Sequence, residues 1–214
     1  MSDLPLNARY AGPAAAPASG VWWLVLPFAA ALTIAAAVLA LCGADDSGIR
    51  AALLTTARFA FLLFLPAYTG GALATLFGPA FDRLRHHGRE WGLAFAAALA
   101  IHLGLVAWLC LSGDIPPVRT FIVFGVAACC VYGLALFSMA KLQHCLGPRA
   151  WAVLRFLAMN YIAAAFADDF LRIAPSFTLA YLLVYLPFVL LAIAGPALYG
   201  AAFIKRWAPR FSFR

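Results

Sequence analysis

Six long runs of apolar residues dominate this chain, and they restrict it to one class of fold. Each run has the roughly 20 residues that a helix needs to cross about 30 Å of hydrocarbon. The six runs lie near 21–43, 51–79, 91–112, 118–141, 150–174 and 179–204. Of the 214 residues, 66% are apolar and 11% charged, whereas soluble domains are roughly 45–50% apolar and about 25% charged. The sequence therefore predicts an all-α, polytopic membrane protein built as a six-transmembrane-helix bundle in a lipid bilayer.

The runs also define the domain organisation. Residues 1–20 are expected to form a cytoplasmic N-terminal segment, 21–204 the six-helix domain, and 205–214 a basic cytoplasmic tail against anionic headgroups. The first run exceeds the roughly 7–15 apolar residues of a signal-peptide core, so we expect an uncleaved anchor. The second run contains Pro66 and then Gly70-Gly71, which predicts a kinked or broken helix.

Basic residues are distributed unevenly between the two sides of the predicted bundle. One side carries both termini and ten basic residues, which are Arg9, Arg83, Arg85, Arg89, Lys141, Arg149, Lys205, Arg206, Arg210 and Arg214. The other side carries three, namely Arg50, Arg119 and Arg172. Because cytoplasmic loops of membrane proteins are enriched in Lys and Arg, this bias predicts that both termini are cytoplasmic. The high pI of about 9.5 is thus attributed to topology and not to nucleic-acid binding.

The chain lacks the local motifs of a soluble cofactor domain. It contains neither the GxGxxG dinucleotide fingerprint nor a GxxxxGK[ST] phosphate-binding loop. Its five cysteines form no CxxC pair, and most fall in apolar runs, which is typical of small buried hydrophobic residues. Redox or energy input must therefore come from another protein or from a diffusing small molecule.

A single histidine interrupts the third apolar run. His102 is the only polar side chain within WGLAFAAALAIHLGLVAW, residues 91–108. Both ring nitrogens of a neutral imidazole need partners that hydrocarbon does not offer. Three roles are open for His102: a hydrogen-bonded interhelical residue, a proton-relay group, or an axial ligand of a b-type haem.

The other ionisable residues within the runs are also candidate functional residues, because they are costly in hydrocarbon. Arg58 lies at a depth similar to that of Asp168 and Asp169, so an ion pair with one of them is expected, with separate snorkelling as the alternative. Arg155 lies near the cytoplasmic end of the fifth run. It either snorkels to that surface or contacts an anionic group, such as a haem propionate or a quinone carbonyl.

The stretch GREWGLAFAAALAIH, residues 88–102, resembles the third-helix signature of the ferric-reductase-like transmembrane family. The resemblance is closest to the membrane haem subunit of the bacterial periplasmic methionine-sulfoxide reductase system. The matching residues are Arg89, Gly92-Leu93 and His102, and LGPRAWAVLR, residues 146–155, is similar to the family's entry into helix 5.

This resemblance implies a function in electron transfer through the bacterial inner membrane. His102 would ligate the iron of a b-type haem, with Arg89 and Arg155 as further cofactor-binding residues. A separate reductase or accessory protein would be the partner, with quinone or flavin at the cytoplasmic side. The chain would then be the membrane haem subunit of an oxidoreductase system.

The chain departs from this family where helix 5 should supply histidines. Arg155 and Asp168 stand at the two family positions, so Met159, one turn beyond Arg155, is the candidate for a second axial ligand. A haem-free relative acting as an accessory or scaffold subunit is the alternative, in which Asn160 or Tyr161 would hydrogen-bond His102. A weaker alternative is a proton pathway or small transporter that uses Arg58, His102, Asp168 and Asp169.

Overall fold

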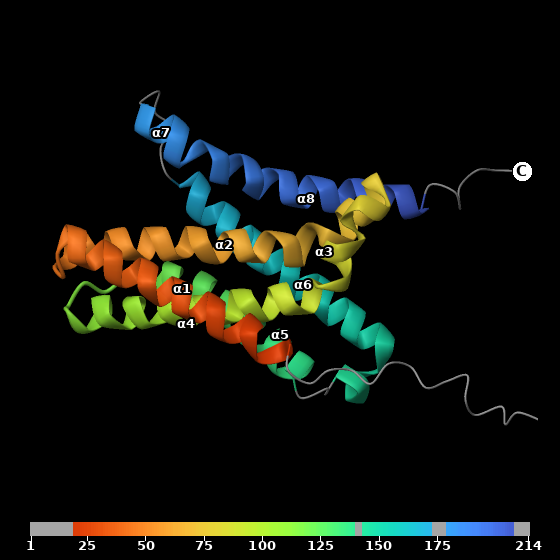
Figure 1. The fold of residues 1–214 in the computed structure, drawn as a ribbon, viewed down its shortest axis with the longest axis horizontal. Helices are drawn as coiled ribbons and strands as arrows, with labels where there is room; N and C mark the ends of the chain where they lie inside the picture. Colours follow the sequence, from red (N-terminus) through yellow and green to blue (C-terminus); the bar gives the residue numbers. More distant parts are fainter. Residues whose placement is uncertain (1–18, 140–142, 173–178, 208–214) are drawn as a thin grey trace, which may run out of the picture.

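The chain folds into long helices that run roughly along one direction (Figure 1). The computed structural model describes residues 19–139, 143–172 and 179–207. The long helices are α1 (Ser19–Cys42), α2 (Asp46–Phe77), α4 (Gly88–Leu111), α5 (Val118–Met139), α6 (Gln143–Leu171) and α8 (Leu186–Trp207). The short ones are η2 (Pro79–Phe81), α3 (Asp82–His86) and α7 (Leu179–Val184). Within the described residues there is no β-strand, which confirms the all-α prediction.

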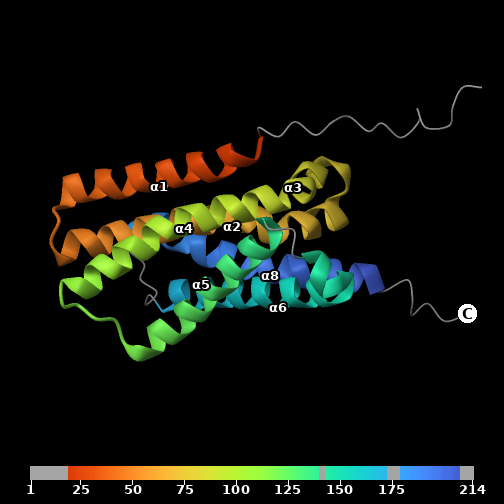
Figure 2. The ribbon, with the colours of Figure 1, turned by 90° about the horizontal axis from the view of Figure 1, so that it is seen from below.

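Each long helix contains a segment that is long and apolar enough to cross a membrane. These six candidate spans suggest a multi-pass membrane protein in a lipid bilayer. Ser19 and Trp207, the first and last described residues, lie toward the same end of the bundle, on the right in Figure 1. In Figure 2, α5 is inclined to the other long helices and joins α4 through residues 112–117.

The second helix begins earlier than the apolar pattern predicts, because a local cap extends it. The Asp45 carboxylate accepts a hydrogen bond from the Gly48 N–H at 2.9 Å and another from the Ser47 hydroxyl at 2.9 Å. These hydrogen bonds, that from Gly48 first, hold the pKa of the Asp45 carboxyl below its usual value. The cap satisfies one of the free amides of the first turn, so α2 starts at Asp46 and not near residue 51.

Prolines act differently in two of the predicted spans. α2 continues through Pro66 to Phe77 without a break, so the alternative of a broken second helix is wrong. The sixth run is instead divided, with α7 ending at Val184 and α8 beginning at Leu186. Pro187 has no amide hydrogen to donate back into the preceding turn, but its fixed φ suits the first turn of a new helix.

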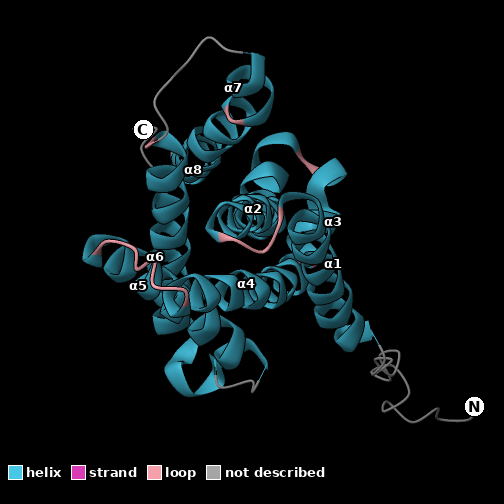
Figure 3. Cartoon of the chain, turned by 90° about the vertical axis from the view of Figure 1, so that its left-hand side faces the viewer, coloured by secondary structure: helices cyan, strands magenta, loops and turns pink. Residues whose placement is uncertain are grey.

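The core is centred on α2. Figure 3 shows α2 nearly end-on, with α1, α4, α6 and α8 around it. Phe61 and Phe64 of α2 are both 1% exposed. The Phe61 ring centroid lies 5.0 Å from those of Phe166 and Phe170 on α6, and Phe64 lies 5.3 Å from Phe95 on α4. This aromatic cluster packs α2 against α4 and α6.

The two ends of the bundle differ in charge. The end that holds Ser19 and Trp207, here called the basic end, carries the described residues Arg83, Arg85, Arg89, Arg149, Arg155 and Lys205 against Asp82 and Glu90. The opposite end, here called the acidic end, carries Arg50, Arg119 and Arg172 against Asp45, Asp46, Asp114, Asp168 and Asp169.

Candidate functional site

His102 is oriented by a hydroxyl group on the neighbouring helix. Its Nδ1 lies 3.1 Å from Oγ1 of Thr56, a fully buried residue of α2. The Thr56 hydroxyl also lies 2.8 Å from the carbonyl oxygen of Ala52, one turn earlier in α2. A hydroxyl has one hydrogen to donate, and the shorter contact to the Ala52 carbonyl takes it. The Thr56 oxygen therefore accepts from His102, so Nδ1 carries the proton of the neutral ring.

This arrangement leaves the lone pair of the other ring nitrogen free. Among the described residues, Nε2 of His102 has no hydrogen-bond partner. The expected partners on α6 are engaged elsewhere. Asn160 accepts from the Tyr68 hydroxyl at 2.9 Å, and Tyr161 donates to the Val123 carbonyl at 3.2 Å. The prediction that one of them hydrogen-bonds His102 is wrong, because α2 supplies the partner.

His102 lines a cavity of about 450 Å³ between α2, α4, α5 and α6, here called the His102 cavity. Its walls are almost entirely apolar, with Leu53, Leu99, Phe124, Ala128 and Phe166 among the lining residues. The lining also includes Arg50, Thr120 and Asp169, which belong to the acidic half of the bundle. His102 is thus the one imidazole on the described lining of a large apolar cavity.

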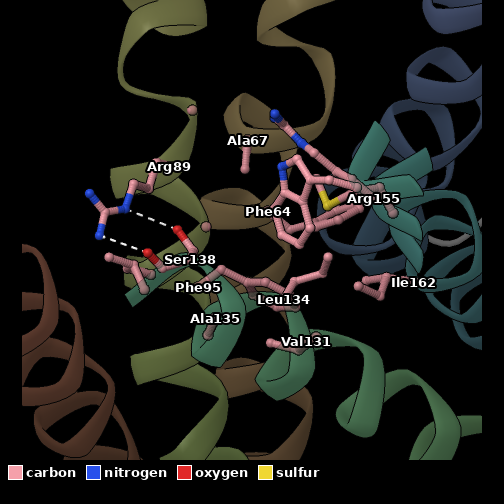
Figure 4. A pocket seen from close by; sticks show the side chains of 15 residues that line it. Phe64, Ala67, Arg89, Phe95, Val131, Leu134, Ala135, Ser138, Arg155 and Ile162 are labelled. Carbon is pink, nitrogen blue, oxygen red and sulfur yellow. Dashed lines mark hydrogen bonds between the residues drawn. The ribbon is translucent and has the colours of Figure 1, made fainter. Parts of the chain in front are cut away.

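The other predicted cofactor residues lie together in a second cavity. Arg89, Arg155 and Met159 line a space of about 130 Å³ between the same four helices, here called the arginine cavity (Figure 4). Arg155 and Met159 share a helix face, as their spacing predicts, and both line this cavity. The structure thus groups these three residues with each other, while His102 lines a different cavity.

Three apolar residues line both cavities. Phe95 from α4, Val131 from α5 and Ile162 from α6 contribute to the walls of the His102 cavity and of the arginine cavity. They form a partition between the two spaces. The structure therefore does not present Met159 and His102 as two ligands that face each other across one cavity.

Arg58 contacts aromatic rings in place of the carboxylate predicted for it. Its guanidinium carbon lies 4.5 Å from the ring centroid of Tyr185 and 5.4 Å from that of Phe188. Nε and Nη2 of Arg58 are buried without a hydrogen-bond partner, and Arg58 has no ion pair among the described residues. The predicted pair with Asp168 or Asp169 is therefore absent in this structure, because aromatic faces occupy the positions around the cation.

Asp168 is instead part of a charge cluster at the acidic end. It pairs with Arg172 one turn later in α6, and with Arg119 of α5 at 3.4 Å. Both arginine side chains are exposed, and they neutralise the carboxylate without Arg58.

A double-mutant cycle tests whether Arg58 is coupled to the neighbouring carboxylate. Because no ion pair joins them and Arg58 acts on Asp169 only at longer range, we expect the coupling energy between Arg58→Met and Asp169→Asn to stay below about 1.5 kcal/mol. The measurement is denaturant unfolding of the two single variants and the double variant in the same detergent. A coupling energy above about 1.5 kcal/mol would show that the ion pair predicted from the sequence forms.

The comparisons with known proteins give no relative. No family model, curated protein or solved structure matches the chain.

Proposed function

We propose that this chain is a multi-pass protein of the bacterial inner membrane that transfers electrons through one b-type haem ligated by His102. The observation that carries the proposal is that His102 lines the His102 cavity while its Nδ1 is held by Thr56, which leaves Nε2 without a hydrogen-bond partner among the described residues. Histidines that ligate metals usually have the other ring nitrogen fixed in this way. The resemblance of residues 88–102 to a haem-ligating helix supports the same assignment.

The lining of the His102 cavity fits a flat, apolar cofactor held from one side. Its volume of about 450 Å³ lies within the roughly 300–1,000 Å³ of typical cofactor sites. In the part of the chain that the structure describes, no second histidine and no methionine or cysteine belongs to the lining. His102 would therefore be the sole protein ligand of the iron, in place of the His102–Met159 ligation expected from the sequence. When bound, the haem would supply one-electron redox chemistry at the centre of the bundle.

The charge difference between the two ends supports an orientation in the membrane. Cytoplasmic ends of membrane proteins are enriched in Lys and Arg, so we assign the basic end, and both termini, to the cytoplasm. The chain has no dinucleotide-binding motif. A separate reductase, or quinone or flavin at the cytoplasmic side, would accordingly deliver the electrons.

The absorption spectrum of the purified protein tests this function. Protein from haem-replete cells is recorded in detergent, first oxidised and then reduced with dithionite. We expect a Soret band that shifts on reduction. A colourless protein would overturn the redox proposal and favour the haem-free accessory subunit.

Thr56 is expected to position the haem ligand. Thr56→Val keeps the side-chain shape but removes the oxygen that accepts from Nδ1, so the ring loses its fixed orientation. We expect haem affinity to fall on the order of tenfold or more, as for other partners of metal-bound histidines. The measurement is a haemin titration of the haem-depleted protein.

The neighbouring residue provides a matched control. The Thr55 hydroxyl donates to the Ala51 carbonyl of its own helix at 2.8 Å, so Thr55→Val removes a similar hydroxyl without touching His102. It should leave haem affinity unchanged. Equal losses in both variants would assign the effect to α2 packing and not to the orientation of His102.

A further inference from the structure

The arginine cavity lies where the bundle reaches the basic end. A β-carbon built on Gly88, the first residue of α4, would lie 3.7 Å from Nη2 of Arg155. Arg155 is part of α6, so its guanidinium reaches across to the start of α4. The start of a membrane span is the level at which lipid headgroups lie.

The two arginines of this cavity have different partners. Arg89 is fixed by Ser138 at the end of α5, donating from Nε to Oγ at 2.9 Å and from Nη2 to the carbonyl oxygen at 3.0 Å. Arg155 makes no hydrogen bond or ion pair among the described residues. None of the described residues that line the cavity is an aspartate or glutamate. The Arg89 guanidinium is directed toward Ser138 and away from Arg155 (Figure 4), so Arg155 is the positive charge on this space without a counter-charge from its described walls.

The rest of the cavity is apolar and partly open. Phe64, Met159 and Ile162 contribute to its walls, and Trp151 lies beside Arg155 on α6. A β-carbon added to Gly92 would meet no atom within 4 Å, so this side of α4 faces open space. The volume of about 130 Å³ is well below the roughly 300 Å³ at which small-molecule sites begin. A cavity of this volume can hold a lipid headgroup or part of an acyl chain, but not a whole macrocycle.

We propose that the arginine cavity binds an anionic phospholipid. Its phosphate would contact Arg155, and the first part of an acyl chain would lie along Phe64, Met159 and Ile162. Guanidinium groups bind phosphate strongly through charge-assisted hydrogen bonds. This site is separate from the haem proposal, because the two ligands use different cavities.

The test measures lipid binding to the full-length protein in detergent by native mass spectrometry. The probes are dioleoyl phosphatidylglycerol, which is anionic, dioleoyl phosphatidylcholine, which is zwitterionic, and inorganic phosphate. We expect the anionic lipid to bind about tenfold more tightly than the zwitterionic one, as one charged hydrogen bond would produce. Arg155→Gln should remove this preference, and Arg155→Lys should keep most of it.

Two further variants separate the cavity from general surface charge. Arg149→Gln removes an exposed arginine of the same helix that does not line the cavity, and it should keep the lipid preference. Gly92→Leu fills the open space without changing charge, and it should weaken lipid binding about tenfold while leaving the Soret band unchanged.

Three results would overturn the proposal. Equal binding of the two lipids would mean that charge is not recognised. Equal losses in Arg155→Gln and Arg149→Gln would indicate general surface attraction. Inorganic phosphate that binds as tightly as the anionic lipid would identify a site for free phosphate. None of these three results depends on the haem spectrum. The lipid proposal can therefore fail while the haem proposal holds, and the haem proposal can fail while the lipid proposal holds.

Discussion

Replacing His102 with alanine is expected to abolish haem binding. The substitution removes the imidazole of His102, and no other described residue on the lining of the His102 cavity provides an imidazole, thioether or thiolate. The haem content per protein, measured from the reduced pyridine complex, should fall from near one to near zero. The variant should remain folded, because the change enlarges a cavity that already exists.

A second histidine provides the control for this prediction. His86 is exposed at the basic end, where its Nδ1 contacts the Asp82 carbonyl at 2.7 Å. His86→Ala therefore removes an accessible imidazole and should leave haem content unchanged. If His102→Ala keeps its Soret band while His86→Ala loses it, the haem is bound at the surface and the proposed site is wrong.

Replacing Phe61 with alanine is expected to cause a large loss of stability. Phe61 is 1% exposed, and its ring lies 5.0 Å from both Phe166 and Phe170 of α6 and 6.3 Å from Phe188 of α8. Buried Phe→Ala changes cost about 3–5 kcal/mol. In a bilayer the transfer term is reduced, since lipid tails are as apolar as the core, so we expect about 3 kcal/mol from lost packing and the cavity.

The next residue in α2 provides the comparison. Leu62 is 46% exposed, so Leu62→Ala should lower the free energy of unfolding by less than about 1 kcal/mol. Both variants are measured by steric trapping in bicelles, which reports unfolding within a lipid environment. Similar losses for the two variants would show that the aromatic cluster does not hold α2 against α6 and α8.

The sequence predicts the class of fold well, because six runs of sufficient length leave few alternatives. It predicts helix ends less well, since these depend on single residues. The carboxylate of Asp45 extends α2 toward the acidic end, and Pro187 divides the sixth run. Pro66, by contrast, is accommodated within a continuous helix. Hydropathy is averaged over many residues, so it does not show which single residue starts, ends or divides a helix.

The candidate site is only partly visible in the sequence. His102 is conspicuous because it is the single polar residue of its run, and the spacing of Arg155 and Met159 correctly places them on one face. Thr56 gives no comparable signal. A threonine within a helix satisfies its own hydroxyl with the carbonyl four residues earlier, and its contact with His102 joins residues 46 positions apart. Such a pair becomes evident only when the packing of α2 against α4 is known.

The partition made by Phe95, Val131 and Ile162 has a consequence for the bilayer itself. Two hollow spaces lie within the same group of helices, one toward each end, and these three residues line both. In a bilayer these three hydrocarbon side chains would be the wall that separates the two spaces, so a smaller residue at any of the three positions is expected to connect them.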